Sequence, residues 1–328
     1  MLDGCRLTRN LARKGMSDLL LAAHFFEPDD KYRAFQATAV AMGLIDDAAG
    51  IPSDDYEPPP ARKREILAEL DHFTRMIREK RIDRSVPFAE DLRLALVRFE
   101  IPDWPFISLA EAMRIDLDNE RFDTLGRLLG HFAEDTAGPE AVFWHLAGCS
   151  FDNRGQLVLP EFDVREAAAP LAVFSRLVNI LRDFKPDFLC RPRPMVYIDL
   201  ETSDMFFVRE DEMAEAVITG RQSLKFTKMI KWYFNRITHF QKQAQDALDH
   251  LSGNLPPDGR MAANLVYELT STVARKISAH GYVLVRENLN LTRPEIESAA
   301  RLSATLSGQS EKTTLERLRL SIRFNRAG

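Results

Sequence analysis

The feature that most constrains this chain is a helical repeat of apolar residues that continues along almost its whole length. Apolar side chains recur at the three- and four-residue spacing of an amphipathic helix, and few runs alternate as strands do. Only 15 of the 328 residues are glycine, while leucine, alanine, arginine and glutamate are frequent. The sequence therefore predicts an all-α protein.

The breaks between the predicted helices are short. They fall at EPDD, IPSDDYEPPP, RFEIPDWP, SFDNRGQLVLPEFD and CRPRPMVYIDLETSD. None is long enough for an interdomain linker, so we predict one helical domain over residues 1–306 and a basic, loosely attached tail over residues 307–328. The predicted helices are 8–26, 30–48, 60–81, 88–99, 104–118, 122–149, 166–186, 209–251, 257–287 and 293–306.

Charge and composition argue against several classes of protein. The net charge of −5 is mild and argues against a nucleic-acid binder. No apolar run approaches the roughly 20 residues that cross a bilayer, and the start MLDGCRLTRN lacks the apolar core of a signal peptide. Cys5, Cys149 and Cys190 lack metal-ligand spacing, so we expect free thiols in a reducing compartment. We expect a soluble, cytoplasmic protein, and its oligomeric state is left open.

A ladder of polar residues grows out of an apolar helical segment at VNILRDFKPDF. Asn179, Asp183 and Asp187 are four residues apart each time. Four residues turn a helix about 40° beyond a full turn, so the three side chains point to one side. Such a face either holds something positively charged or lies in water at an exposed helix end. Pro186 favours the second alternative, because proline interrupts helices.

A second acidic signal is the pair Asp46 and Asp47 in AFQATAVAMGLIDDAAG. The pair follows a dozen almost wholly apolar residues and lies at a predicted helix C-terminus, where the helix dipole is already negative. A divalent cation is the simplest compensation, and Mg²⁺ prefers carboxylate and phosphate oxygens. The alternative is that the pair only opens a polar loop.

The order and spacing of these motifs resemble the squalene/phytoene synthase family. The resemblance rests on LIDDAAG, ISLAEAMRIDLDNERFDTLGRLLGHFAEDTAG, VNILRDFKPDF followed by MVYIDL, and ISAHGYVLVRENLNLTRPE, and it covers roughly residues 8–306. It implies an all-α isoprenoid-synthase fold and Mg²⁺-dependent ionisation of an allylic prenyl diphosphate, in the head-to-head class of prenyl synthases. This chain is identified as a divergent member.

The resemblance also implies a set of site residues. Catalytic aspartates would be Asp46, Asp47, Asp183 and Asp187, which with Asn179 would hold Mg²⁺ and through it the diphosphate. The candidate counter-charges for the diphosphate are Arg176, Arg182 and Arg191. An apolar pocket would shield the carbocation from water. Its candidate lining residues are Ser17, Leu20, His24, Ala39, Gly43, Phe132, Glu140 and Phe174.

The chain departs from the family pattern on the side of the second substrate. The first acidic motif is normally Asp-Asp-x-x-Asp, but its fifth position here is Gly50. Ala39 and Gly43 stand where the family has a tyrosine and a diphosphate-binding arginine, and Phe132 replaces another tyrosine. Glu140 introduces an acid near the expected pocket, where it could accept a proton or orient a polar group.

These departures lead us to expect a prenyltransferase that passes an allylic cation to a second small molecule, a non-prenyl and in our interpretation aromatic acceptor, as squalene-synthase-like enzymes of natural-product pathways do. The first alternative is head-to-head condensation of two prenyl diphosphates. The second alternative is a non-catalytic partner subunit, which the incomplete first motif favours and the retained NILRD disfavours.

Overall fold

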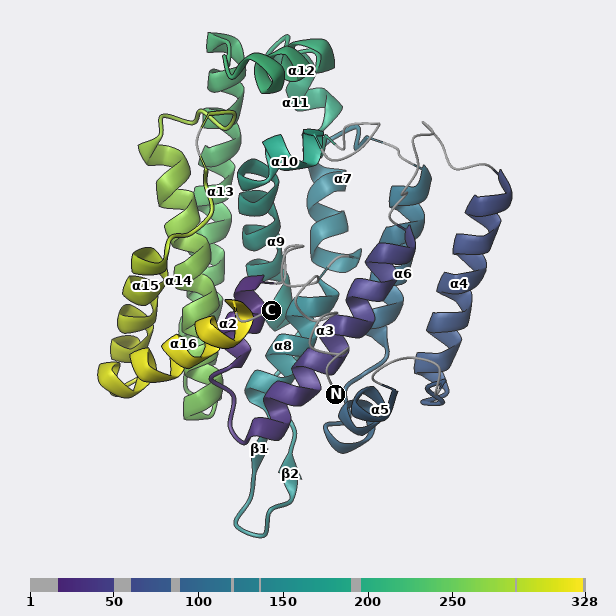
Figure 1. Ribbon diagram of the computed structural model, residues 1–328, viewed down its shortest axis with the longest axis vertical. Helices are drawn as coiled ribbons and strands as arrows, with labels where there is room; N and C mark the ends of the chain where they lie inside the picture. The colour runs from purple at the N-terminus through teal and green to yellow at the C-terminus, as the bar shows by residue number, and fades with distance from the viewer. Residues whose placement is uncertain are drawn as a thin grey trace.

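The computed structural model describes residues 17–49, 60–83, 89–118, 121–135, 137–189, 196–286 and 288–326. Within these residues the chain forms a bundle of helices with one short hairpin at its base (Figure 1). The prediction of an all-α protein is confirmed.

Two central helices, α8 (Gly138–Gly148) and α9 (Val164–Arg182), form the middle of the bundle (Figure 1). Every residue of α8 is buried, as expected for a helix that is apolar on nearly all sides. Gly138 lies so close to α6 that a β-carbon built there would be 2.4 Å from a backbone oxygen. The helix α9 begins at Asp163, whose carboxylate accepts hydrogen bonds from the backbone of Arg165 and Glu166.

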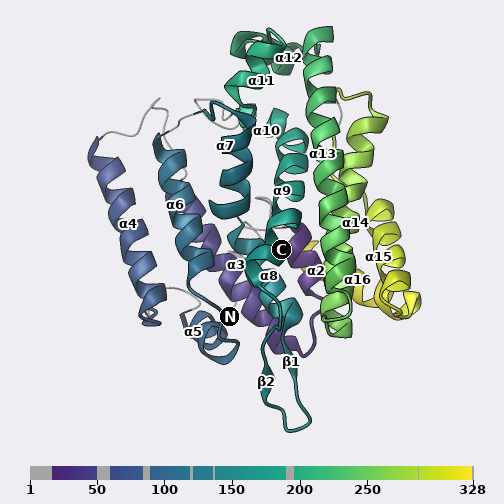
Figure 2. The same cartoon turned by 180° about the vertical axis from the view of Figure 1, so that it is seen from behind.

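The central pair is enclosed by longer helices on both sides (Figures 1 and 2). α13 (Leu224–Leu251) and α14 (Pro257–Ala279) pack against α9, while α3 (Asp29–Ala49) and α6 (Trp104–Asp118) pack against α8. None of the described helices combines the length and apolar character needed to span a bilayer. The other elements are α2 (Ser17–Ala23), α4 (Pro60–Arg78), α5 (Ala89–Arg98), α7 (Leu125–Gly130), the π-helical turn η1 (His131–Asp135), α10 (Phe184–Leu189), α11 (Leu200–Met205), α12 (Glu210–Thr219), α15 (Arg293–Leu306), α16 (Glu311–Arg326), and the strands β1 (Ser150–Phe151) and β2 (Leu157–Val158), which pair antiparallel.

Two long predicted helices are interrupted. The predicted helix 122–149 is divided into α7, η1 and α8, because Pro139 starts a new helix. The predicted helix 209–251 is divided into α12 and α13. Gly220 ends α12 in the left-handed conformation with φ of 65°, and the Ser223 side chain caps the start of α13.

The C-terminal segment belongs to the body of the protein over most of its length. Residues 311–326 form α16, which packs against α15 and α2. Leu318 is fully buried, and Arg317 donates hydrogen bonds to the Phe26 carbonyl oxygen at 3.1 Å and to Glu27 at 2.7 Å. The expectation of loose attachment is therefore wrong for this helix, since its apolar face has a partner. The domain division at residue 306 stays a prediction.

Candidate functional site

The polar ladder Asn179, Asp183 and Asp187 spans the junction of α9 and α10. The predicted single helix 166–186 ends at Arg182, and Asp183 is its C-terminal cap. The backbone register continues across the junction, because the Asp183 amide donates to the Asn179 carbonyl and the Asp187 amide to the Asp183 carbonyl, both at 2.8 Å. Pro186 lies in the first turn of α10, where its missing N–H is no loss. All three ladder residues are half-buried, so the proline does not expose them as a free helix end.

The paired aspartates Asp46 and Asp47 lie in the last turn of α3. Both α3 and α9 start near the hairpin and run toward the opposite end of the bundle, so their C-terminal ends share that end (Figure 1). The side chains of Asp46 and Asp47 are outside the described part of the chain, as are Gly50 and Arg191. Among the side chains that are described, no three His, Cys, Asp or Glu residues are grouped for metal binding.

Arg182 is the central charge of the ladder. Its Nε and Nη2 atoms donate to the two carboxylate oxygens of Asp183 at 2.8 and 2.5 Å, and its Nη1 atom lies 3.7 Å from an oxygen of Asp18 on α2. Burial by itself lowers the pKa of Arg182, but the hydrogen bond and charge of Asp183, with the charges of Asp18 and Asp187, raise the pKa above its ordinary value. Arg182 is therefore a permanent cation at the end of α9.

Asp18 is a site residue that the sequence reasoning missed. Its signal in the sequence is a single acid in the otherwise apolar helix SDLLLAA. Only the packing of the chain shows that this acid faces the end of α9, more than 160 residues later in the sequence.

The second candidate arginine, Arg176, lies one turn before Asn179 on α9. Its Nη2 atom is 3.8 Å from an oxygen of Glu140, a distance for an ion pair and not for a hydrogen bond. The Glu140 side chain is 5% exposed and is the one carboxylate on the wholly buried α8. Its Oε2 atom has no hydrogen-bond partner among the described residues. The candidate counter-charge Arg176 and the acid Glu140 thus pair across the two central helices.

Most of the predicted pocket residues are buried in the apolar interior. Phe174 is fully buried and its ring centroid lies 5.9 Å from that of Tyr267, between α9 and α14. The side chain of Ser17 is outside the described part of the chain. The remaining predicted apolar lining residues that are buried are Leu20, Ala39, Gly43 and Phe132. Leu20, Ala39, Phe132 and Phe174 belong to one continuous hydrophobic core.

His24, also predicted for the pocket, is part of a polar chain between α2 and α3. Its ring stacks on Tyr32 with centroids 4.0 Å apart, and its Nε2 atom is 2.8 Å from the Tyr32 hydroxyl. Gln36 donates to the same hydroxyl at 2.7 Å. Burial, followed by the charge of Arg317, lowers the pKa of His24 to about 4. His24 is therefore neutral near pH 7.

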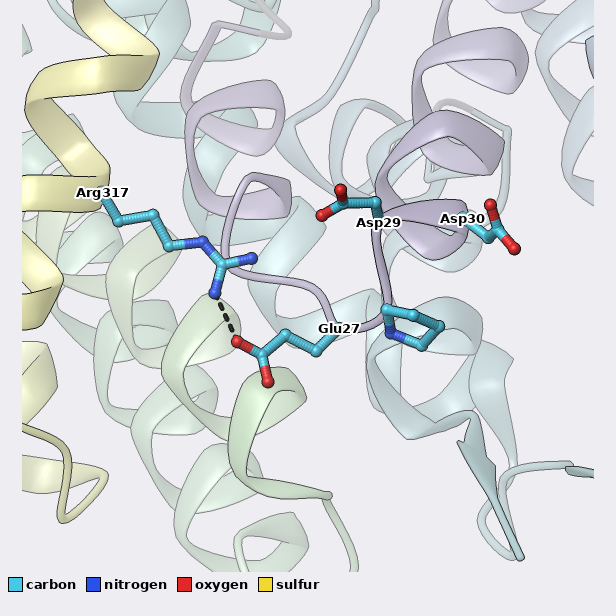
Figure 3. Close-up of a pocket in the computed structure, with 5 residues that line it drawn as sticks. Glu27, Asp29, Asp30 and Arg317 are labelled. Atoms are coloured by element: carbon cyan, nitrogen blue, oxygen red, sulfur yellow. Dashed lines mark hydrogen bonds and ion pairs between the residues drawn. The ribbon is translucent and has the colours of Figure 1, made fainter. Parts of the chain in front are cut away.

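An open hollow of about 690 Å³ lies at the other end of α3, lined by Glu27, Pro28, Asp29, Asp30 and Arg317 (Figure 3). Seventeen residues of helix, or about 25 Å, separate Asp29 from Asp46. Glu27 and Arg317 are joined by the ion pair drawn across the hollow in Figure 3. The hollow lies at the end of α3 opposite to Asp46 and Asp47, so we do not assign it to the candidate site.

The donor set of the ladder suits a hard divalent cation. An amide and two carboxylates supply oxygen atoms, which are the ligands that Mg²⁺ prefers. All three side chains are half-buried, which lowers the competition from water. The same end of α9 carries the guanidinium of Arg182, so it combines oxygen ligands for a metal with a fixed positive charge for an anion.

Comparison with known proteins supports one family. The family model described as squalene/phytoene synthase matches residues 12–295. A chloroplastic phytoene synthase of Narcissus pseudonarcissus is 27% identical over 163 residues, which cover 47% of this chain and 34% of that protein. The match thus spans about a third of the length of this curated relative.

Two solved structures show the same fold. A dehydrosqualene synthase in complex with ligand has a TM-score of 0.68 and 17% identity, covering 93% of this chain and 96% of that one. The squalene synthase HpnC of Alicyclobacillus acidocaldarius has a TM-score of 0.63 and 16% identity, covering 85% and 95%. The bundle is thus an all-α isoprenoid-synthase fold, and the chain belongs to the squalene/phytoene synthase family, a family of prenyltransferases of isoprenoid biosynthesis.

Proposed function

We propose that this protein is a Mg²⁺-dependent prenyltransferase that ionises an allylic prenyl diphosphate and couples two prenyl diphosphates head to head. The family match over residues 12–295 supports the proposal most strongly. The similar proteins are named as phytoene, dehydrosqualene and squalene synthases. Our first interpretation of the sequence, transfer to an aromatic acceptor, has no support from these comparisons, which favour the coupling alternative.

In this proposal the end of α9 binds the diphosphate end of the substrate. Asn179, Asp183 and Asp187 would hold Mg²⁺ with their oxygen atoms, and Asp46 and Asp47 at the end of α3 would be the second acidic motif. When bound, the metal neutralises the charge of the leaving diphosphate. Arg182, kept cationic by its acidic neighbours, adds a fixed positive charge at the same end.

The apolar interior would hold the prenyl chain and exclude water from the cation. A carbocation that meets water is lost as an alcohol, so the lining must be apolar and closely packed. The buried side chains of Leu20, Phe132 and Phe174 meet this requirement. The small residues Ala39 and Gly43 are both buried and lie four residues apart, on one face of α3.

One observation favours transfer to a foreign acceptor as a second candidate function. Glu140 is a buried carboxylate at the centre of the bundle, and its Oε2 atom has no hydrogen-bond partner among the described residues. Such an oxygen can accept a proton or a hydrogen bond from a polar acceptor. A head-to-head coupling of two hydrocarbon chains does not by itself require it.

The test is release of pyrophosphate with Mg²⁺ from C5, C10, C15 and C20 allylic diphosphates, each alone, with mass spectrometry of the organic products. A dimeric C30 or C40 hydrocarbon or a cyclopropyl diphosphate supports coupling. Prenyl alcohols alone, or turnover only after an aromatic extract is added, would replace coupling by the foreign-acceptor function. No turnover under any condition would contradict both and favour the non-catalytic partner subunit.

The variant Asp183→Asn connects the reaction to the site. It keeps the volume of the side chain and removes one carboxylate from the ladder, so we expect turnover to be abolished while the circular dichroism spectrum stays unchanged. Undiminished pyrophosphate release by this variant would contradict the assignment of the metal site.

A further inference from the structure

The N-terminal helix α2 brings an acid to the end of the metal motif. Asp18 lies in the first turn of α2, and one of its oxygens is 3.7 Å from Nη1 of Arg182. The side chain of Arg182 is only 10% exposed, and that of Asp18 is 23% exposed. The pair therefore lies largely away from water, where opposite charges interact more strongly than at the surface.

Arg182 divides its nitrogen atoms between two acids. Nε and Nη2 donate to the two oxygens of Asp183, in a forked arrangement that leaves neither oxygen free of the guanidinium. Nη1 is directed to Asp18. The guanidinium thus forms a bridge from α2 to the carboxylate that the proposed function uses as a metal ligand.

A cation at Asp183 must take over at least one of these oxygens. Arg182 then loses part of its hydrogen bonding while nine-tenths of its side chain remains buried, which is costly for a charged group without another acid. Asp18 is such an acid and is already within ion-pair distance. A small shift of the guanidinium from Asp183 toward Asp18 is enough, so no large side-chain movement is required.

We propose that Asp18 is a positioning residue of the metal motif, which holds Arg182 when a divalent cation binds an oxygen of Asp183. The inference rests on the proposed function, since it takes Asp183 as a metal ligand. It assigns to α2 a role in metal affinity, because the acid on α2 lowers the cost of withdrawing Arg182 from Asp183. This effect acts through the guanidinium and favours tighter binding of the cation.

The test is Mn²⁺ binding to the purified full-length protein, followed by electron paramagnetic resonance of free Mn²⁺, with and without inorganic pyrophosphate. Residues that orient a metal ligand typically change affinity by roughly 10-fold or more, so we expect Asp18→Asn to weaken Mn²⁺ binding by about 10-fold. Asp18→Glu keeps the carboxylate and should restore affinity to within about 2-fold. In an Arg182→Gln background there is no guanidinium to hold, so Asp18→Asn should then change affinity by no more than about 2-fold.

The matched control is Asp211→Asn. Asp211 accepts the same forked pair of hydrogen bonds from a nearby arginine, Arg209, at 3.1 and 2.7 Å, but at an exposed position outside the site. Its substitution should leave Mn²⁺ affinity unchanged. This control measures how Mn²⁺ affinity responds to the loss of an arginine–aspartate pair that lies outside the metal site.

The outcomes separate this inference from the proposed function. If Asp183→Asn weakens Mn²⁺ binding but Asp18→Asn does not, Asp18 has no positioning role. An equal loss from Asp18→Asn with and without Arg182 would also overturn the inference, because Asp18 would then act without the guanidinium. If Asp183→Asn has no effect on Mn²⁺ binding, both the inference and the assignment of the metal motif fail.

Discussion

Substitution of Asp258 should reduce the stability of the fold far more than substitution of its partner Lys31. Lys31 is fully buried, and its Nζ atom donates to Asp258 at 2.6 Å and to the Cys149 carbonyl oxygen at 2.9 Å. The Phe26 ring centroid lies 5.1 Å from the same nitrogen. Asp258 also accepts a hydrogen bond from the Glu27 backbone at 2.9 Å. The pair therefore joins the starts of α3 and α14 to the end of α8.

The expected magnitudes follow from what each substitution leaves behind. Asp258→Asn leaves a buried ammonium group without a counter-charge, and loss of one partner of a buried ion pair costs about 3–5 kcal/mol. Lys31→Met replaces the cation with an apolar chain of similar length. Asp258 then keeps the Glu27 amide and the favourable N-terminus of α14, so we expect a cost of about 1–2 kcal/mol. The double variant should be no less stable than Asp258→Asn alone.

The assay is equilibrium urea unfolding, compared at equal m values so that only stability changes. The control is Asp246→Asn, because Asp246 pairs with Lys242 at the same distance of 2.6 Å on the surface, with the two side chains 61% and 74% exposed. This substitution should cost less than about 0.5 kcal/mol. If Asp258→Asn costs no more than this control, or no more than Lys31→Met, the reasoning about buried charge at this junction is wrong.

Three further predictions concern titration, the central pair and close packing. Because the pKa of His24 is lowered to about 4 in the folded protein, protonation of His24 opposes folding. The contribution of His24 to the free energy of unfolding should be constant above about pH 6.5 and fall by up to about 3 kcal/mol between pH 6.5 and 4. His24→Gln should flatten this profile in urea unfolding at several pH values. Arg176→Leu should leave Glu140 as an uncompensated buried acid and lower stability by about 3 kcal/mol. Adding Glu140→Leu to this variant should restore most of the lost stability, as measured by thermal unfolding. A second loss that adds to the first would contradict the pairing. Gly259→Ala would place a β-carbon 1.9 Å from a backbone oxygen of α8 and should lower the free energy of unfolding by about 2 kcal/mol or more. A β-carbon at Gly253 would have nothing within 4 Å, so Gly253→Ala should be tolerated. Thermal unfolding of the two variants makes the comparison.

The fold class was accessible from the sequence because helical periodicity is a local property. Apolar residues at helical spacing define which face of each segment is buried, wherever its partner lies. Helix ends were predicted less well, since they depend on single caps. Gly220 and Pro139 divide helices that the periodicity alone joins. The prediction that the C-terminal segment is loosely attached was wrong because it rested on the basic composition. The segment also has an apolar face, which α2 and α15 cover.

The spacing of Asn179, Asp183 and Asp187 also survives the interruption of the helix at Asp183, because backbone hydrogen bonds keep the register on both sides of this residue. Their roles as metal ligands stay predictions, as do those of Asp46 and Asp47.

By itself the sequence determined an all-α chain and the two acidic motifs, because both depend only on the spacing of residues that are close together in the chain. Only the tertiary structure decided which charges meet. The pairs Asp18 with Arg182 and Lys31 with Asp258 join helices that are distant in the sequence, and the pair Glu140 with Arg176 joins two successive helices. Local spacing contains no information on such contacts, since they arise when separate apolar faces pack and bring the polar residues beside them together.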